Sequence, residues 1–177
     1  MGKQEFLKQS KISIILDSYD DIFSDFDPRF YSERSLSDDF LNETKKVCRG
    51  KNFIFSSLQL MIPTKMRDKK YEDMIADRLH RYFEKHYYST VEDIKTQRKK
   101  GAVFMACGII LMSLATYLSL EGGKSFIMNF LRVLVEPGGW FCLWNGFDQI
   151  IFAPNQKKTD LSFFDTMSKV DINFIPF

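Results

Sequence analysis

The chain lacks the residues and patterns that mark several large classes of protein. Its 177 residues include three cysteines, and Cys48, Cys107 and Cys142 stand at no spacing typical of a metal site or a redox pair. We therefore expect no disulfide framework and a reducing compartment. Lys and Arg total 25 against 23 Asp and Glu, so the basic excess of nucleic-acid-binding proteins is missing. No nucleic-acid partner is expected.

Motifs for catalysis are equally absent. The sequence contains no Walker loop, no G-x-G-x-x-G pattern and no closely spaced cysteine pair. His80 and His86 are the only histidines, and a spacing of six places them on different faces of a helix. No nucleophile has a base at a diagnostic spacing. The sequence thus predicts a protein that is not an enzyme and that needs no cofactor.

What the chain does contain is a long run without charge. Residues 101–120 are uncharged and mostly apolar. As a helix rising about 1.5 Å per residue, they would extend roughly 30 Å, which is the thickness of the hydrocarbon core of a bilayer. Buried helices of soluble proteins are usually shorter and amphipathic. We therefore predict a transmembrane helix over 101–120.

A second apolar segment covers residues 126–152, after a short glycine-containing turn at 121–124. A turn this short favours an antiparallel neighbour, so residues 101–153 are predicted to form a two-helix transmembrane hairpin. The second segment contains the helix-disrupting residues Pro137, Gly138 and Gly139. We expect the helix to break or kink there, which membrane helices tolerate where neighbours satisfy the freed backbone groups.

Two charged residues within the second segment need an explanation. Arg132 and Glu136 stand four apart, so on a helix their side chains can face each other. A charge within a span costs roughly 3 kcal/mol and is usually paired. Arg132 can extend to the outer interface, the pair can bridge neighbouring helices or subunits, or it can line a conducting path. The sequence leaves these three interpretations open.

Small residues are expected where membrane helices contact each other. The candidate packing residues are Ala102 and Ala106 on the first span, and Gly139, Cys142 and Gly146 on the second. Either the two spans of one chain or spans of several copies could meet at these faces.

Basic residues flank the hairpin unequally. Residues 98–100 (RKK) precede the first span and Lys157 and Lys158 follow the second, whereas the turn contains only Lys124. By the positive-inside rule, both termini are expected in the cytoplasm. The sequence thus predicts a multi-pass protein of the inner (cytoplasmic) membrane. Its expected partners are the lipid bilayer, further copies of itself as a homo-oligomer, and a protein partner.

The remaining segments predict a small cytoplasmic domain. Residues 11–16, 53–62 and 170–175 have the pattern of strands, and helices are expected over 37–49 and 161–168. An apolar residue at every third or fourth position predicts a long amphipathic helix over 68–100 that continues into the first span.

The predicted fold class is a membrane α+β protein. Residues 1–100 form a cytoplasmic domain with a sheet of about three strands and helices on it, and residues 101–153 form the hairpin. Residues 154–177 return a helix and a strand to the sheet.

Residues 17–28 are rich in aspartate, and hard cations prefer such oxygen ligands. The candidate metal ligands are Asp20, Asp21, Asp25 and Asp27. The segment lacks the spacing and the glycine of an EF-hand, however, and aspartates also cap helices and form turns. We expect mainly turns, caps and salt bridges to Arg29 and Arg34.

Residues 26–40 (FDPRFYSERSLSDDF) and 135–140 (VEPGGW) resemble small uncharacterised bacterial membrane proteins with two adjacent transmembrane helices. The resemblance covers most of the chain and implies that the hairpin and the domain form one unit. It supplies no catalytic motif.

The leading hypothesis is a membrane-anchored assembly or scaffold protein that works by self-association or by recruiting a partner. The alternative is an oligomeric membrane effector or channel with a path past Arg132 and Glu136. Two spans per chain cannot enclose a pore, so that function would require an oligomer. An enzyme that uses the aspartate segment with a divalent metal is a third hypothesis.

Overall fold

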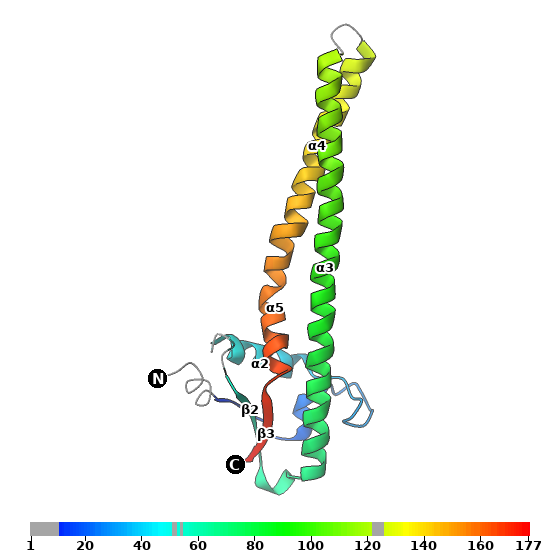
Figure 1. Ribbon diagram of the computed structural model, residues 1–177. Helices are drawn as coiled ribbons and strands as arrows, with labels where there is room; N and C mark the ends of the chain where they lie inside the picture. Colours follow the sequence, from blue (N-terminus) through cyan, green and yellow to red (C-terminus); the bar gives the residue numbers. More distant parts are fainter. Residues whose placement is uncertain (1–10, 51–52, 54, 122–125) are drawn as a thin grey trace, which may run out of the picture. The chain divides into compact units, whose positions relative to one another are not determined.

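The computed structural model describes residues 11–50, 53, 55–121 and 126–177, and the chain divides into two compact units. The first comprises Met1–Tyr88 and Asp160–Phe177, and the second comprises Ser89–Thr159. In chain order the elements (Figure 1) are β1 (Lys11–Ile15), η1 (Tyr19–Ile22), α2 (Asp38–Gly50), β2 (Ser57–Ile62), η2 (Thr64–Met66), α3 (Lys69–Glu121), α4 (Phe126–Phe147), η3 (Asp148–Phe152), α5 (Ala153–Met167) and β3 (Asp171–Pro176).

The three strands form one parallel sheet in the order β1-β2-β3. The three predicted strands are thus confirmed, with shifts at their ends. β2 begins at Ser57 rather than at residue 53. The reason is local, because Phe53 has a φ angle of 58°. This left-handed conformation cannot continue an extended strand.

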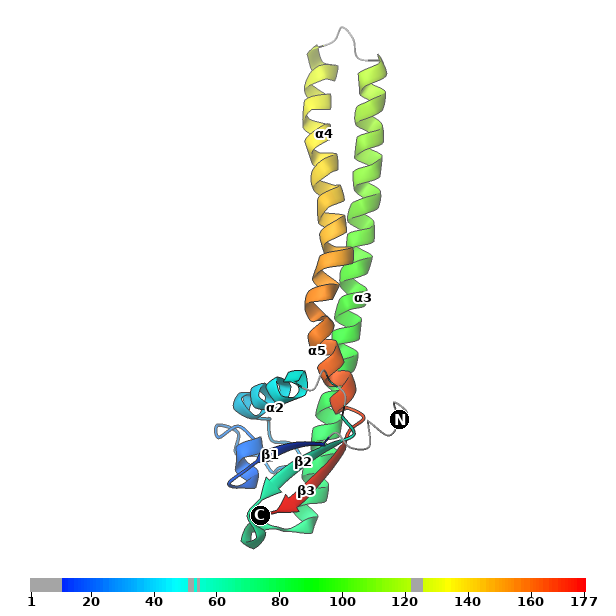
Figure 2. The same cartoon turned by 90° about the vertical axis from the view of Figure 1, so that its left-hand side faces the viewer.

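Only one face of the sheet is buried. The side chains on this face are Ile12 and Ile14 of β1, Leu58, Leu60 and Ile62 of β2, and the partly buried Ile172 and Phe174 of β3. In the view of Figure 2, α3 lies behind the sheet. The opposite face contains the exposed members of the alternating pattern, such as Ile15, which is 67% exposed. None of the described helices shields that opposite face.

Three helices cover the buried face of the sheet. Their buried residues are Phe40, Thr44 and Cys48 of α2, Ile75, Leu79 and Phe83 of α3, and Phe163 and Met167 of α5. The four-residue spacing on α3 is the stripe that predicted the amphipathic helix. The thiol of Cys48 lies 3.9 Å from the sulfur of Met167, and burial raises the pKa of Cys48 to about 12. Cys48 therefore packs as a small apolar residue.

Helix α3 runs without interruption from Lys69 to Glu121, which confirms the predicted continuity through Gly101. Helix α4 continues from Phe126 to Phe147 with Pro137 in its interior, so the helix does not break at Pro137, Gly138 and Gly139. The other expectation, a kink at these residues, stays a prediction. Proline removes a single amide donor, and the neighbouring turns keep theirs. The irregular segment lies further on, in the π-helical turn η3, and α5 follows directly. The predicted turn at 121–124 lies, apart from Glu121, outside the described residues.

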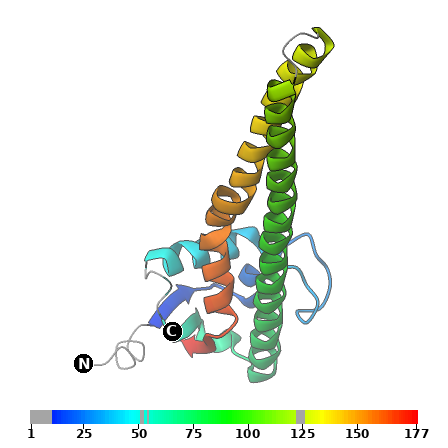
Figure 3. The same ribbon diagram turned by 45° about the horizontal axis from the view of Figure 1, so that its top comes forward.

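Within the second unit, α4 lies beside the C-terminal part of α3 and runs in the opposite direction (Figures 1 and 3). Gly101 and Gly108 of α3 and Gly139 and Gly146 of α4 are buried where the helices meet. A β-carbon on Gly108 would lie 2.9 Å from the nitrogen of Leu143 and 3.0 Å from the carbonyl oxygen of Gly139. Backbone atoms cannot move aside, so only glycine permits this approach. We call these four glycines the glycine seam.

The outer surface of the same helix pair is apolar. Large exposed side chains include Val103, Ile109, Ile110, Leu114 and Leu120 of α3, and Phe126, Ile127, Val133, Leu134, Phe141 and Trp144 of α4. In the described part of the chain, one helix is long and apolar enough to cross a membrane. It is α3, and its most apolar stretch is only 11% buried. A core helix of a soluble protein would instead be mostly buried.

Candidate functional site

Arg132 and Glu136 lie on one face of α4. The Nε of Arg132 is 3.9 Å from the Oε2 of Glu136, and the two side chains are 44% and 50% exposed. They line a cleft of about 140 Å³ together with Met112, Ala115, Thr116 and Ser119 of α3. The cleft therefore combines two opposite charges with two hydroxyl groups inside an otherwise apolar helix pair.

The position of Arg132 follows from the register of the two helices. Gly101 of α3 lies against Gly146 of α4, and Gly108 of α3 lies against Gly139 of α4. Seven residues forward along α3 therefore correspond to seven residues backward along α4. The next step places Arg132 opposite Ala115, which is buried. A small residue at 115 leaves room for the long arginine side chain, and this is why the cleft opens at that level.

Among the described residues, the pair makes no polar contact closer than this 3.9 Å separation. Arginine has five N–H donors and a carboxylate has about four acceptor positions, and 3.9 Å is a loose separation for an ion pair. Thr116 donates its hydroxyl hydrogen to the carbonyl oxygen of Met112 at 2.9 Å, which leaves its oxygen able to accept a bond. The cleft can thus accommodate a further polar group.

The predicted packing residues fall into two groups. Gly139 and Gly146 belong to the glycine seam, and the partly buried Cys142 is close enough to Cys107 for their thiols to share a hydrogen bond. Ala102 and Ala106, in contrast, are exposed. At about 100° per residue, Ala102 lies about 100° from Gly101 around the helix and Ala106 lies about 140° from it, so both lie off the contact face that Gly101 and Gly108 occupy. The seven-residue spacing shared by Gly101, Gly108, Ala115, Gly139 and Gly146 was the signal in the sequence.

The aspartate segment is held together by protein partners. Asp20 pairs with Arg34 and accepts the hydroxyl hydrogen of Tyr31 at 3.2 Å. Asp21 completes a capping box with Ser18 at the start of η1. Within the described residues, no group of three or more His, Cys, Asp or Glu is arranged to hold a metal ion.

Asp27 is the centre of the following turn. Its carboxylate accepts hydrogen bonds from the Nη2 of Arg29 at 2.7 Å and from the backbone N–H of Ser35 at 2.7 Å. The guanidinium of Arg29, with the amide of Ser35, holds the pKa of Asp27 well below its usual range. The turn closed in this way presents Phe26 and Phe30 almost fully to solvent, with exposed fractions of 97% and 89%.

A buried carboxylate that the sequence did not indicate lies at the start of α3. Glu72 is 6% exposed and accepts hydrogen bonds from the Nε and Nη2 of Arg67 at 2.7 and 2.8 Å. The hydroxyl of Tyr19 donates to Glu72 at 3.2 Å and accepts the N–H of Asp68 at 2.9 Å. Tyr19 is 53 positions away in the chain, so no local pattern reveals this network.

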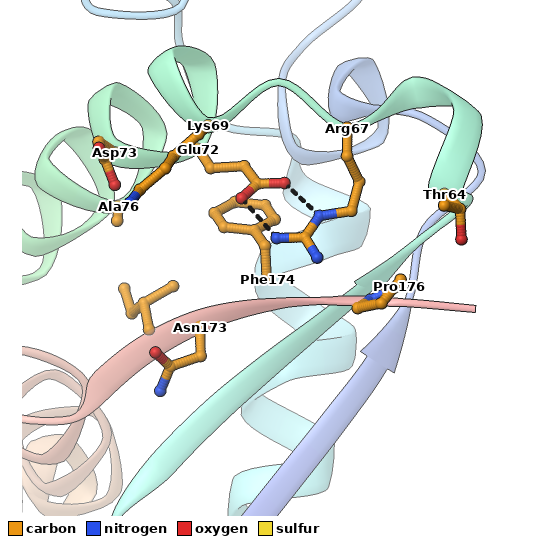
Figure 4. A pocket seen from close by; sticks show the side chains of 10 residues that line it. Thr64, Arg67, Lys69, Glu72, Asp73, Ala76, Asn173, Phe174 and Pro176 are labelled. Atoms are coloured by element: carbon orange, nitrogen blue, oxygen red, sulfur yellow. Dashed lines mark hydrogen bonds and ion pairs between the residues drawn. The ribbon is translucent and has the colours of Figure 1, made fainter.

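The network borders a groove of about 640 Å³ between the start of α3 and β3, with Phe174 beside the ion pair (Figure 4). Hydrogen bonds from Arg67 lower the pKa of Glu72, and burial raises the pKa of Tyr19. Glu72 thus stays ionised and fully bonded. The network joins η1, α3 and the loop before α3.

The two histidines are also used in packing. The Nε2 of His80 lies 2.8 Å from the carbonyl oxygen of Val170, to which it donates. His86 lies between the rings of Tyr82 and Phe164, with centroids 4.2 and 5.3 Å away, and burial lowers its pKa. Both side chains tie α3 to the segment around α5 and β3.

Comparison of the chain with protein-family models, curated proteins and solved structures finds no match.

Proposed function

We propose that the protein is a membrane-anchored assembly protein that works without catalysis. In this proposal α3 and α4 cross the bilayer as a hairpin and carry the parallel-sheet domain on the cytoplasmic side. The protein acts by associating with further copies of itself and by recruiting a protein partner.

The observation that carries the proposal is the apolar exterior of the second unit. Its fully buried contact positions are mostly glycines, while many of its isoleucines, leucines and phenylalanines are exposed. Water would penalise such a surface at about 25 cal/mol per Å² of apolar area, and lipid would not. Close contact through small residues is how helices pack in a bilayer, where apolar side chains gain nothing from hiding.

Orientation is a further part of the proposal. The basic residues at 98–100 and at 157–158, compared with Lys124 alone in the turn, favour cytoplasmic termini. A cysteine introduced at position 122 should react with a membrane-impermeant reagent from the outer side only. Reaction exclusively from the cytoplasmic side would refute this orientation.

Assembly is supported by the charge pair. Arg132 and Glu136 are about half exposed on the outside of a helix pair that lipid would surround. Exposed charges at that level are costly unless a polar group covers them. A neighbouring copy that approaches this face would cover both charges and supply polar partners to the cleft beside Ala115.

The alternative function is an oligomeric channel, and one observation favours it. The cleft is lined by the hydroxyls of Thr116 and Ser119 as well as by the charge pair. Such a lining could form part of a polar path if several copies surrounded it.

A double-mutant cycle separates these functions. The four proteins are the wild type, Arg132→Gln, Glu136→Gln and the double variant, each reconstituted in lipid vesicles. Oligomer stability and ion flux are measured on all four. Under the assembly proposal each single change weakens the oligomer, because it leaves the other charge without its partner, and the double variant regains part of the loss.

Other outcomes contradict the proposal. If the oligomer is unchanged while ion flux or its selectivity changes, conduction is the better account. If the two substitutions simply add and flux is unchanged, Arg132 is an interfacial anchor that extends to the headgroups. If no oligomer forms in the wild type, the assembly function is wrong.

A further inference from the structure

The open face of the sheet is the surface of the first unit that most needs an explanation, because no described helix covers it. Parallel sheets are nearly always covered on both faces, yet the described helices cover only one. The strand register arranges the open face in three cross-strand rows. They are Lys11–Ser57–Asp171, Ser13–Gln59–Asn173 and Ile15–Met61–Ile175.

The three rows differ in chemistry. The first has a positive charge at one edge of the sheet and a negative charge at the other, and the side chains of both Lys11 and Asp171 are exposed. Neither makes an ion pair with another described residue. The second row is polar and uncharged. The third is apolar, with Ile15 mostly exposed and Met61 and Ile175 partly exposed.

We infer that this face binds the same face of a second copy, about a two-fold axis parallel to β2. This inference rests on the proposed function, since it names a surface through which the copies assemble. The axis lays β2 on β2 of the second copy, and β1 on β3. Lys11 then faces Asp171 of the second copy, and Asp171 faces Lys11. Ile15 faces Ile175 at the other end, and Met61 meets its own equivalent on the axis.

The charges select this arrangement over the other two-fold arrangement. In that second arrangement the two-fold axis is parallel to the sheets but perpendicular to β2, so the strands of the two copies run in opposite directions. It would lay the row of Lys11 and Asp171 on the row of Ile15 and Ile175, so that charges would be buried against apolar side chains. Facing sheets stand about 10 Å apart, a gap that the side chains of Lys11 and Asp171 can close together. The face is thus self-complementary in the sense that a symmetric dimer requires.

The size of the face indicates how strong the contact is. Three strands of about five residues cover roughly 14 by 17 Å, which is smaller than the face of a standard protein interface of about 800 Å² per partner. Alone, the contact would be weak. Confinement of both copies to one membrane raises their effective concentration and makes a small interface sufficient. The test must therefore use the full chain in a bilayer.

The test uses two single charge reversals, Lys11→Glu and Asp171→Lys. Each variant carries charges of one sign in the first row, so two identical copies repel each other. A mixture of the two variants places opposite charges against each other. We measure association by energy transfer between differently labelled copies in vesicles. Each variant alone should associate roughly tenfold or more weakly than the wild type, and the mixture should recover.

The mixture distinguishes an interface from a structural role, because a charge pair within one chain could not be restored by a second chain. Lys46→Glu on α2 is the control, since Lys46 is 78% exposed on another element and undergoes the same change of charge. Its association should equal that of the wild type.

Three results would overturn the inference. If both variants associate as well alone as the wild type does, the sheet face is not the interface, although assembly through another surface would stand. If the mixture fails to recover, the two charges do not face each other. If the wild type shows no association, this inference and the proposed function fail together.

Discussion

The two units of the chain distribute their side chains in opposite ways. In the first unit the core contains large side chains such as Phe83 and Phe23, and most charged residues lie outside it, with Glu72 as a buried exception. Among the described residues of the second unit the buried positions belong to glycine, alanine and Pro154, and phenylalanine and tryptophan lie outside. Water drives large apolar groups inward, whereas lipid leaves close backbone contact as the main source of stability. Under the proposed function this contrast is expected, because the first unit would face water and the second would face lipid.

The largest expected effect concerns the core of the first unit. Phe83→Ala should lower the free energy of unfolding of that unit by about 3–5 kcal/mol, because it removes a fully buried ring that packs on Phe163. The measurement is chemical unfolding of the bilayer-embedded protein, followed by a probe in the first unit.

The matched control is Phe141→Ala on α4, where the same substitution removes a ring that is 64% exposed. In lipid it should change stability by less than about 0.5 kcal/mol. Equal losses of stability from Phe83→Ala and Phe141→Ala would contradict the proposal that the two units face different solvents.

The second prediction concerns the glycine seam. Gly108→Ala should destabilise the packing of α3 on α4 by about 1–3 kcal/mol, since the new methyl group would meet backbone atoms of Leu143 and Gly139. The native cysteines provide the readout. Mild oxidation should cross-link Cys107 to Cys142 in the wild type and do so more slowly in the variant.

Gly138→Ala is the matched control, because a β-carbon there would meet nothing closer than 4.0 Å. It should cross-link at the wild-type rate. Equal behaviour of the two alanine variants would show that the helices do not meet at the seam.

The third prediction uses acid. The pKa of Glu72 is lowered in the folded chain by its hydrogen bonds to Arg67. Its contribution to stability is therefore complete above the ordinary pKa of about 4.5 and is lost as the pH falls below that value toward the folded pKa. The melting temperature of the first unit should fall over this range.

Glu72→Gln should reduce the melting temperature at neutral pH and weaken its dependence on acid below pH 4.5. Glu84→Gln, at an exposed position of the same helix, serves as the control. An unaltered acid profile in Glu72→Gln would contradict the role given to the buried network.

The smallest expected effect lies in the loop around Asp27. Phe26→Ala and Phe30→Ala should each change the stability of the first unit by less than about 0.5 kcal/mol, because both rings are exposed. Phe23→Ala, three residues away and buried, is the contrasting variant and should cost several kcal/mol. A large loss at Phe26 would show that the loop packs on another part of the protein.

The sequence predicted the elements whose patterns are local. Alternation marked β1 and β3, and the spacing of Ile75, Leu79 and Phe83 marked α3. The start of β2 was missed because Phe53 adopts a left-handed conformation that a bulky residue rarely takes. The extent of α5 was missed because its first residues are polar and follow a π-helical turn.

Contacts between distant residues were harder to foresee. The register of α3 on α4 depends on which residues allow close approach. The sequence indicated Gly139 and Gly146 on α4, but on α3 it indicated Ala102 and Ala106 rather than Gly101 and Gly108. The bond between Tyr19 and Glu72 depends on the fold bringing η1 to α3. The rows of the open sheet face required the strand order, since separate strands do not show that Lys11 and Asp171 share a row.

The most direct test of the contrast between the units is labelling from within the lipid. A photoreactive diazirine dissolved in the bilayer inserts into whatever side chains it meets, and mass spectrometry locates the adducts. The account predicts adducts at exposed apolar residues of both α3 beyond residue 101 and α4, such as Ile110 and Phe141, and none in residues 11–88. Labelling of α3 without α4, or equal labelling of the first unit, would contradict a hairpin that lies in lipid and a first unit that lies in water.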